Sequence, residues 1–435
     1  MIINHHPFST NDKGNLVIGG VDSLTLAEKY GTPLYVYDVG IIRKNARSFI
    51  KAFENLDVKA KVAYASKAFS CIAMVQVANQ EGLCLDVVSQ GELFTALEAG
   101  FPSERIHMHG NNKSRHELKM AIDHQIGCIV IDNFYEIQLL EELLQQEGKT
   151  MDVLLRVTPG VELNTHQYIM TGNEDSKFGF NIVNGQADQA FQLLHNHKHI
   201  RLKGLHCHIG SQIFETEGFK VAVDLLFEQI EKWLDRDGFK PQVLNLGGGY
   251  GIRYTEIDNP LEYNVYVDEI VEAVKKNSER LNILMPEIWI EPGRSIVGNA
   301  GVSLYTVGSS KEIPGIRNYI SVDGGMADNI RPALYEAKYE AVIANKATVK
   351  PIEKASIAGK ACESGDMLIW DLPLPETEPG DILAVFATGA YGYAMASNYN
   401  RLAKPAVVFV EDGTDKLVVK RETAEDIIKN DLSYE

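Results

Sequence analysis

The sequence lacks any apolar run long enough to cross a membrane, and Met1–Ser9 shows no basic start followed by an apolar core. We therefore expect neither a membrane anchor nor a signal peptide, and a cytoplasmic protein. Basic residues are in deficit: 42 Lys and Arg stand against 59 Asp and Glu, a formal net charge of -17. This excess of acidic residues argues against nucleic acid and anionic membranes as partners, but not against a small charged substrate.

Paired cysteines and low-complexity tracts are also missing. The five cysteines are odd in number and have neither disulfide-type nor metal-type spacing, which favours a reduced protein. Four of them lie in apolar runs and are expected to be buried thiols, whereas Cys362 begins the polar loop Cys362–Asp366. The buried set comprises Cys71, Cys84, Cys128 and Cys207.

Short β-prone runs alternate with amphipathic stretches through most of the chain, and the first four recur about every 22 residues, the length of a strand, a helix and two loops. Eight such units predict an α/β fold with a (β/α)8 barrel ending near Arg294; the count of eight disfavours a doubly wound open sheet. The expected strands are 62–66, 84–88, 106–109, 128–131, 153–157, 203–209, 243–246 and 287–290.

After Gly298 strand-like runs dominate, which predicts a separate β-sandwich or β-barrel domain. The early strand at Pro33–Tyr37 is expected to join it. We therefore predict a barrel over residues 37–298 and a β-domain formed by residues 1–36 and 299–435. The expected strands of the β-domain are 302–307, 319–322, 341–344, 354–358, 382–386, 406–410 and 417–419.

Functional residues of such barrels cluster at the carboxyl ends of the strands. Lys67 ends the first strand, and a lone lysine there is most often a solvated side chain. Gly247–Gly249 follows the seventh strand and can wrap a phosphate with bare backbone N–H groups, although a plain tight turn is equally common. Arg294, after the eighth strand, could pair with the same anion or with a substrate carboxylate.

His206 and His208 are two residues apart, so both side chains point to the same face of their strand. They could be metal ligands, but no compact set of further ligands is evident, and a ring stacked on a planar cofactor or an ordinary packed histidine fits as well. Glu291 follows an apolar run and requires a partner, either Arg294 or a protonated pyridine nitrogen. A lysine, a phosphate-type loop, a stacking histidine and a buried acid together match the needs of pyridoxal 5'-phosphate, and no metal is expected.

Seven motifs, spread over nearly the whole chain, resemble the alanine-racemase-like barrel family of pyridoxal-phosphate enzymes, also known as fold type III. Within this family they are similar to the decarboxylases that act on diaminopimelate, and their number and order make the resemblance specific. The motifs are 64–68 (YASKA), 206–212 (HCHIGSQ), 246–249 (LGGG), 291–294 (EPGR), 331–335 (RPALY), 362–366 (CESGD) and 391–397 (YGYAMAS).

The resemblance implies a role for each matching residue in cofactor binding. Lys67 would bind the cofactor covalently, His208 would stack on its ring as part of the catalytic set, and Glu291 would pair with the pyridine nitrogen. The remaining contacts, mainly to the phosphate, are assigned by resemblance to Ser211, Gly248, Gly293, Arg294 and Tyr391.

The resemblance also implies how the substrate is bound. Its distal carboxylate would contact Arg294, Arg331 and Tyr335, its distal ammonium would contact Glu363, and Tyr391 would lie at the same end. Cys362 would donate the proton that replaces the lost carboxylate. In this family the residues matching Cys362 and Glu363 come from the opposite subunit, so a homodimer is expected.

The implied reaction is the decarboxylation of meso-2,6-diaminopimelate to L-lysine and carbon dioxide, the last step of lysine biosynthesis. A decarboxylase of lysine, ornithine or arginine is the first alternative, but it would favour an acid where Arg331 and Tyr335 lie. A racemase would favour an opposed tyrosine base and an arginine at the ring nitrogen. A non-catalytic homologue that binds a partner protein should have lost Lys67 or Cys362, and both are present.

Overall fold

The computed structural model describes residues 5–160 and 176–435. The chain divides into two compact units. The barrel unit comprises Ala46–Gly251 and Pro260–Gly293. The β unit comprises Met1–Asn45, Ile252–Asn259 and Arg294–Glu435.

The barrel unit is built on eight parallel strands that close on themselves, because the last strand, β13, pairs with the first, β5, and β8 pairs with β9. The closed parallel sheet confirms the predicted (β/α)8 fold. Strand β10 (Phe180–Asn181) adds to the edge of β9. The barrel strands are β5 (Ala60–Ala65), β6 (Cys84–Val87), β7 (Ile106–Met108), β8 (Cys128–Ile131), β9 (Met151–Thr158), β11 (Ile200–His206), β12 (Val243–Asn245) and β13 (Glu287–Ile290).

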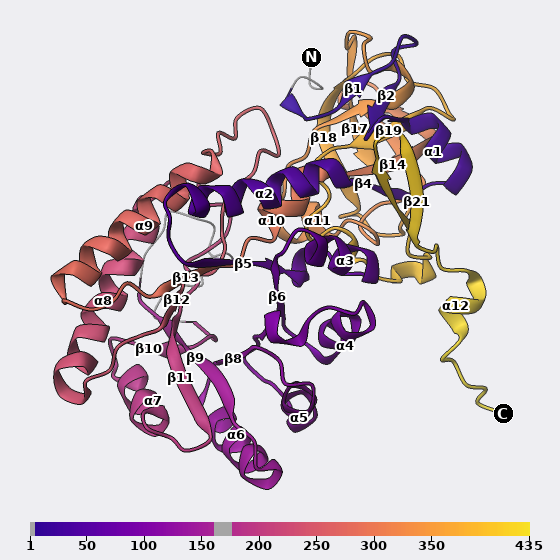
Figure 1. Cartoon of the computed structure of the whole chain (residues 1–435). Helices are drawn as coiled ribbons and strands as arrows, with labels where there is room; N and C mark the ends of the chain where they lie inside the picture. Colours follow the sequence, from indigo (N-terminus) through magenta and orange to yellow (C-terminus); the bar gives the residue numbers. More distant parts are fainter. Residues whose placement is uncertain (1–4, 161–175) are drawn as a thin grey trace. The chain divides into compact units, whose positions relative to one another are not determined.

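Helices α3 to α7 lie on the outer side of these strands (Figure 1). Polar residues start several of them: Ser89, Ser114 and Asn133 each accept a hydrogen bond from a backbone N–H of the first turn, which satisfies a donor that the helix itself cannot. The helices are α2 (Val39–Asn55), α3 (Ile72–Gln80), α4 (Gln90–Glu98), α5 (Arg115–Asp123), α6 (Phe134–Glu147), α7 (Gln186–Leu194), α8 (Glu217–Asp237) and α9 (Tyr263–Arg280).

The β unit contains a nine-stranded sheet. The amino-terminal strand β4 (Leu34–Asp38) lies inside it, antiparallel to β14 and parallel to β20, so the expected assignment of this strand to the β-domain is confirmed. Strand β18 (Met367–Leu374) escaped prediction because its buried and exposed residues do not alternate. The other strands are β14 (Gly301–Ile313), β15 (Arg317–Val322), β16 (Ala341–Ile343), β17 (Glu353–Ala358), β19 (Ile382–Val385), β20 (Ala406–Glu411) and β21 (Thr414–Val419).

Smaller elements complete the β unit. A three-stranded sheet precedes α1, and three short helices follow the barrel in the chain. None of the helices in the described part of the chain combines the length and the apolar composition needed to cross a bilayer. The elements are β1 (Ser9–Thr10), β2 (Leu16–Ile18), β3 (Val21–Asp22), α1 (Ser23–Tyr30), α10 (Arg294–Val297), α11 (Arg331–Tyr335) and α12 (Ala424–Ile428).

Candidate active site

Lys67 lies directly after β5, at the end of the barrel where the other strands also end. Its side chain is exposed, and it forms no hydrogen bond or ion pair with any described residue. The charge of Lys67 nevertheless reaches two neighbouring strand ends. Burial, and after it the Lys67 charge, lower the pKa of His208 well below its usual range, and the same charge acts on Asp86. Lys67 is therefore available for chemistry and lies near both groups.

Glu291, directly after β13, is 7 % exposed and surrounded by hydrogen-bond donors. Asn245 Nδ2 donates to its Oε1 at 2.6 Å, His109 Nε2 lies 2.8 Å from Oε1, and His206 Nε2 lies 3.1 Å from Oε2. Burial alone would raise the pKa of Glu291, but His109 and His206 hold it well below its ordinary value. The acid is therefore a carboxylate at neutral pH, and pairing with Arg294, one of the two alternatives that the sequence left open, is not needed to explain it.

The pKa values of the two histidines beside Glu291 shift in opposite directions. Burial lowers the pKa of His206 to about 4, so its ring is neutral and donates the Nε2 proton to the carboxylate. Burial also disfavours the cationic form of His109, but Asp86, 3.8 Å away, and Glu291 outweigh it and raise the pKa of His109. The two acids therefore favour the protonated form of His109.

No compact set of metal ligands was evident from the sequence, but the structure contains one. Among the described residues, ligand atoms of His109, His206 and Glu291 lie within 4.8 Å of one another. The three residues come from different strand ends, which only barrel closure brings together. The contacts of each histidine with Glu291 account for the cluster, and we interpret it as a carboxylate supported by two imidazoles.

The glycine loop after β12 lies against the same acid. Asn245 Oδ1 accepts a hydrogen bond from Gly247 N at 2.9 Å, and His208 Nδ1 accepts one from Gly248 N at 3.2 Å. A Cβ at position 248 would lie only 2.3 Å from the Glu291 carbonyl oxygen, so no side chain fits there. This bare backbone, beside an available lysine, a half-buried histidine and an ionised acid, fits the donor set that pyridoxal phosphate requires.

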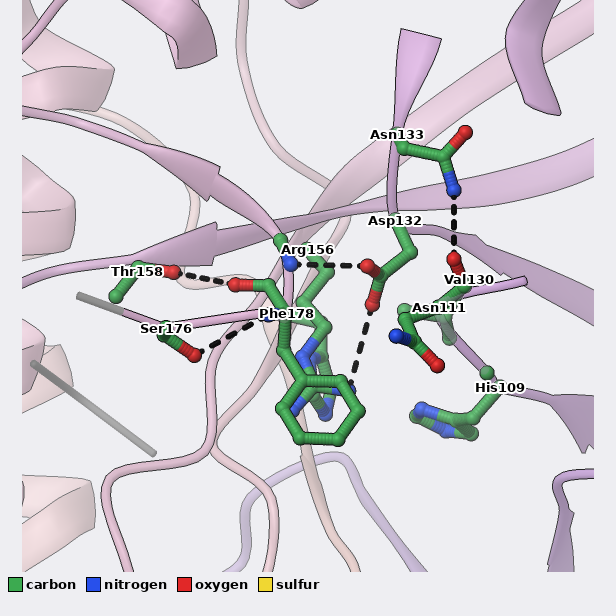
Figure 2. A network of polar contacts seen from close by, with 12 residues as sticks. His109, Asn111, Val130, Asp132, Asn133, Arg156, Thr158, Ser176 and Phe178 are labelled. Atoms are coloured by element: carbon green, nitrogen blue, oxygen red, sulfur yellow. Dashed lines mark hydrogen bonds and ion pairs between the residues drawn. The ribbon is translucent and has the colours of Figure 1, made fainter. Parts of the chain in front are cut away.

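Arg156, on β9, belongs to a polar network at the neighbouring strand ends (Figure 2). Its guanidinium lies 3.5 Å from the Asp132 carboxylate and 4.4 Å from the centre of the Phe178 ring. Asp132 also accepts a hydrogen bond from Gly179 N, and Thr158 Oγ1 donates to the Phe178 carbonyl. The network therefore holds the chain after residue 176 against the strand ends β8 and β9.

The β unit contains a second cluster, built from two arginines and their tyrosine neighbours. Arg331, on α11, is 7 % exposed, and its Nη1 donates to the hydroxyls of Tyr254 at 3.0 Å and Tyr339 at 2.8 Å. Arg294 Nη1 donates to the same Tyr254 hydroxyl, and its guanidinium lies 4.9 Å from the centre of the Tyr391 ring. Within the described residues Arg331 forms no ion pair, although a buried guanidinium normally has an anionic partner.

Three of the predicted substrate-binding and catalytic residues lie on the surface of the β unit. Tyr335 ends α11 and is 38 % exposed. Cys362 and Glu363 are exposed in the loop between β17 and β18. Glu363 accepts hydrogen bonds from the Tyr399 hydroxyl and from Gly365 N, and Cys362 N donates to Asn400 Oδ1. Cys362 is exposed, and Cys84, Cys128 and Cys207 are buried, as predicted. Cys71 is only partly buried, so the prediction of four buried thiols was wrong for this residue.

Sequence reasoning missed Asn245, Tyr254 and Tyr339. Asn245 left one signal, because a polar residue within a buried apolar strand, directly before a glycine run, needs a hydrogen-bond partner. The two tyrosines left none. Tyr254 lies 77 residues from Arg331 and Tyr339 lies 8 residues from it, and tyrosine is common in ordinary cores.

Comparison with known proteins places these features in a family. Residues 39–298 match the family described as "Pyridoxal-dependent decarboxylase, pyridoxal binding domain". The diaminopimelate decarboxylase of Bacillus subtilis is 63 % identical over 99 % of this chain and 98 % of its own length. That of Staphylococcus aureus is 48 % identical over 97 % of this chain and 98 % of its own length.

A solved structure extends the likeness to the fold. The diaminopimelate decarboxylase of M. jannaschii, in co-complex with L-lysine, superposes with a TM-score of 0.92 at 35 % identity. The match covers 100 % of this chain and 99 % of that one, so both units take part in it.

Proposed function

Because the chain belongs to the pyridoxal-dependent decarboxylases and uses pyridoxal 5'-phosphate, we propose that it converts meso-2,6-diaminopimelate to L-lysine and carbon dioxide. The observation that carries the choice of substrate is Arg331, a buried cation without an anionic partner among the described residues. A substrate with a second carboxylate supplies that partner, whereas an ornithine- or arginine-type substrate does not. The proposed reaction is the last step of lysine biosynthesis.

The barrel unit would hold the cofactor. When bound, pyridoxal phosphate supplies an electron sink for the pair of electrons left behind by the departing carboxylate. Lys67 would bind it through its amine, His208 would pack against the ring, and the Glu291 carboxylate would keep a proton on the ring nitrogen. The phosphate would be bound by Gly248 with Ser211, Gly293, Arg294 and Tyr391.

The β unit would bind the distal end of the substrate. Two guanidiniums, Arg294 and Arg331, can grip one carboxylate through paired N–H donors, which a lysine ammonium cannot do. Tyr335 would add a hydroxyl, and Tyr391 would lie at the same end. Fixing the distal end decides which of the two carboxylates can be lost, since the far end is no longer free to exchange places with the near end.

Cys362 and Glu363 would act in a homodimer, each pair serving the opposite subunit. Their exposure on one loop supports this proposal, because a thiol proton donor and a carboxylate for the distal ammonium remain available to a second copy. We propose that residues 37–298 form the cofactor-binding domain and that residues 1–36 and 299–435 form the domain that contributes to the dimer and the active site. A cytoplasmic location fits the small charged substrate and the free thiols.

The proposed function is tested by adding pyridoxal phosphate to the purified protein, recording the visible spectrum, and then assaying L-lysine and carbon dioxide after adding meso-2,6-diaminopimelate. A band of lysine-bound cofactor together with formation of L-lysine is expected. A band without L-lysine would contradict the proposed substrate, and ornithine, arginine and lysine would then be assayed in the same way.

Replacing Arg331 by alanine is expected to raise KM for diaminopimelate about a hundredfold, with a smaller change in kcat. Each hydrogen bond to a charged group contributes about 1.5–3 kcal/mol, and the guanidinium can make two to a carboxylate. Steady-state kinetics measure the change. Arg401→Ala, which removes an exposed arginine paired with Asp431 in the same unit, is the matched control and should leave KM unchanged. An unchanged KM in Arg331→Ala would place the distal carboxylate elsewhere.

Hybrid dimers test the shared site. Lys67→Ala and Cys362→Ala are each expected to be inactive, but mixing them under conditions that exchange subunits should restore up to about a quarter of the wild-type activity. One of the two sites in a mixed dimer then has both an intact lysine and an intact cysteine, and about half of randomly formed dimers are mixed. Activity of the mixture is compared with that of each variant incubated alone. No recovery despite demonstrated exchange would contradict a site shared between subunits.

A further inference from the structure

Tyr254 has a contact set that the family resemblance did not suggest. It lies in Ile252–Asn259, a segment that follows the glycine loop of the barrel but packs with the β unit. One side chain closes the segment on itself, and another joins it to the β unit. Asp258 Oδ2 accepts hydrogen bonds from the backbone N–H groups of Tyr254 and Thr255, at 3.0 and 2.9 Å, and Glu340 Oε1 accepts one from Glu256 N at 2.8 Å. The backbone that carries Tyr254 is therefore held by hydrogen bonds of its own.

The Tyr254 hydroxyl accepts hydrogen bonds from both Arg294 Nη1 and Arg331 Nη1. Both guanidiniums also lie close to its ring, 5.6 and 5.2 Å from the centre. Two like charges repel, and the shared hydroxyl offsets this repulsion together with the Tyr391 ring, whose centre lies 4.9 Å from the Arg294 guanidinium and 6.0 Å from that of Arg331. Arg331 directs only Nη1 to its tyrosine partners, and among the described residues its Nη2 and Nε have no hydrogen-bond partner. Tyr254 thus orients the pair and leaves donors of Arg331 for a ligand.

The electrostatics of the cluster favour an anionic ligand. Burial by itself would raise the pKa of Tyr254, but the two guanidiniums lower it below its ordinary value, which shows how strongly positive the site is. A bound carboxylate would neutralise part of this charge. A ligand without a carboxylate would leave a buried cation with phenol partners only, which is costly.

We propose that Tyr254 is a specificity-determining positioning residue that holds Arg294 and Arg331 as a pair, so that ligands with a distal carboxylate bind and ligands without one are rejected. The inference rests on the proposed function, which assigns the distal carboxylate to these two arginines. It adds that discrimination depends on a hydroxyl that need not touch the substrate.

L-lysine and cadaverine test the inference directly, because they differ by one carboxylate, the one that the proposed reaction retains. Their inhibition constants against diaminopimelate give a preference ratio. The wild-type protein should bind L-lysine at least about a hundredfold more tightly than cadaverine. In Tyr254→Phe this ratio should fall about tenfold, because L-lysine should bind more weakly while the affinity for cadaverine stays the same. The KM for diaminopimelate should rise about tenfold, with kcat nearly unchanged.

Tyr30→Phe is the matched control. It removes a hydroxyl that donates a hydrogen bond to the Asp415 carboxylate at 3.1 Å in the same unit, and it should leave the ratio unchanged. If Tyr254→Phe is poorly folded by thermal unfolding, Asp258→Ala provides a second test, because it frees the segment carrying Tyr254 without altering either arginine, and it should lower the same ratio.

Three outcomes are informative. A selective loss of L-lysine affinity supports the inference. An unchanged ratio in both variants, or equal weakening of both ligands, overturns the role of Tyr254 while leaving the proposed function intact. A wild-type protein that binds cadaverine as tightly as L-lysine overturns the assignment of the carboxylate to the arginine pair, and the inference with it.

Discussion

Lys67→Ala is expected to lower decarboxylase activity at least about 10⁴-fold and to abolish the visible absorbance of lysine-bound cofactor. Lys67 is the cation at the end of β5, and its exposed amine has no competing partner among the described residues. Without that amine the protein has no nucleophile in this position to bind the aldehyde covalently. Absorbance spectra and turnover with diaminopimelate measure the two effects.

Two further variants separate the amine from its charge. Lys67→Arg keeps a cation near His208 and Asp86 but lacks a nucleophilic amine, so it should be as inactive as the alanine variant. Lys61→Ala changes a lysine of the same strand, which lies over the Trp289 ring, and should retain both absorbance and activity. A lysine-bound chromophore that persists in Lys67→Ala would overturn the assignment.

Glu291→Gln is expected to lower kcat about 10²- to 10³-fold with little change in the fold. The amide has nearly the shape of the carboxylate, but it carries no charge to keep a proton on the ring nitrogen. The low pKa of Glu291 means that the wild-type acid remains charged throughout the neutral and mildly acidic range, so the loss should be present across that range. Initial rates from pH 6 to 8 measure it.

Glu287→Gln is the matched control for this variant. Glu287 begins the same strand, β13, which Glu291 follows, and its neutralisation should leave kcat unchanged. Retention of wild-type kcat by Glu291→Gln would show that the three donors around the carboxylate serve packing alone. If the loss of kcat in Glu291→Gln disappeared at acidic pH, a titrating group other than Glu291 would be responsible.

The repeating strand and helix pattern and the position of Lys67 at a strand end could be predicted from the amino-acid residues. Both are local properties: apolar periodicity selects strand or helix within a few residues, and the end of a strand is the end of its apolar run. The eight predicted barrel strands therefore correspond to β5, β6, β7, β8, β9, β11, β12 and β13. Strand β18 was not predicted, because its buried and exposed residues do not alternate and local periodicity therefore does not indicate a strand there.

The tertiary structure alone decided what each polar group contacts. Glu291 meets Asn245 and His206, which lie 46 and 85 residues away in the chain, because closure of the barrel brings these strand ends together. Tyr254 and Arg331 lie 77 residues apart and meet only through the packing of the β unit. Local periodicity carries no information about such pairs. They exist because a buried charge requires partners, and the folded chain determines which groups are near enough to serve.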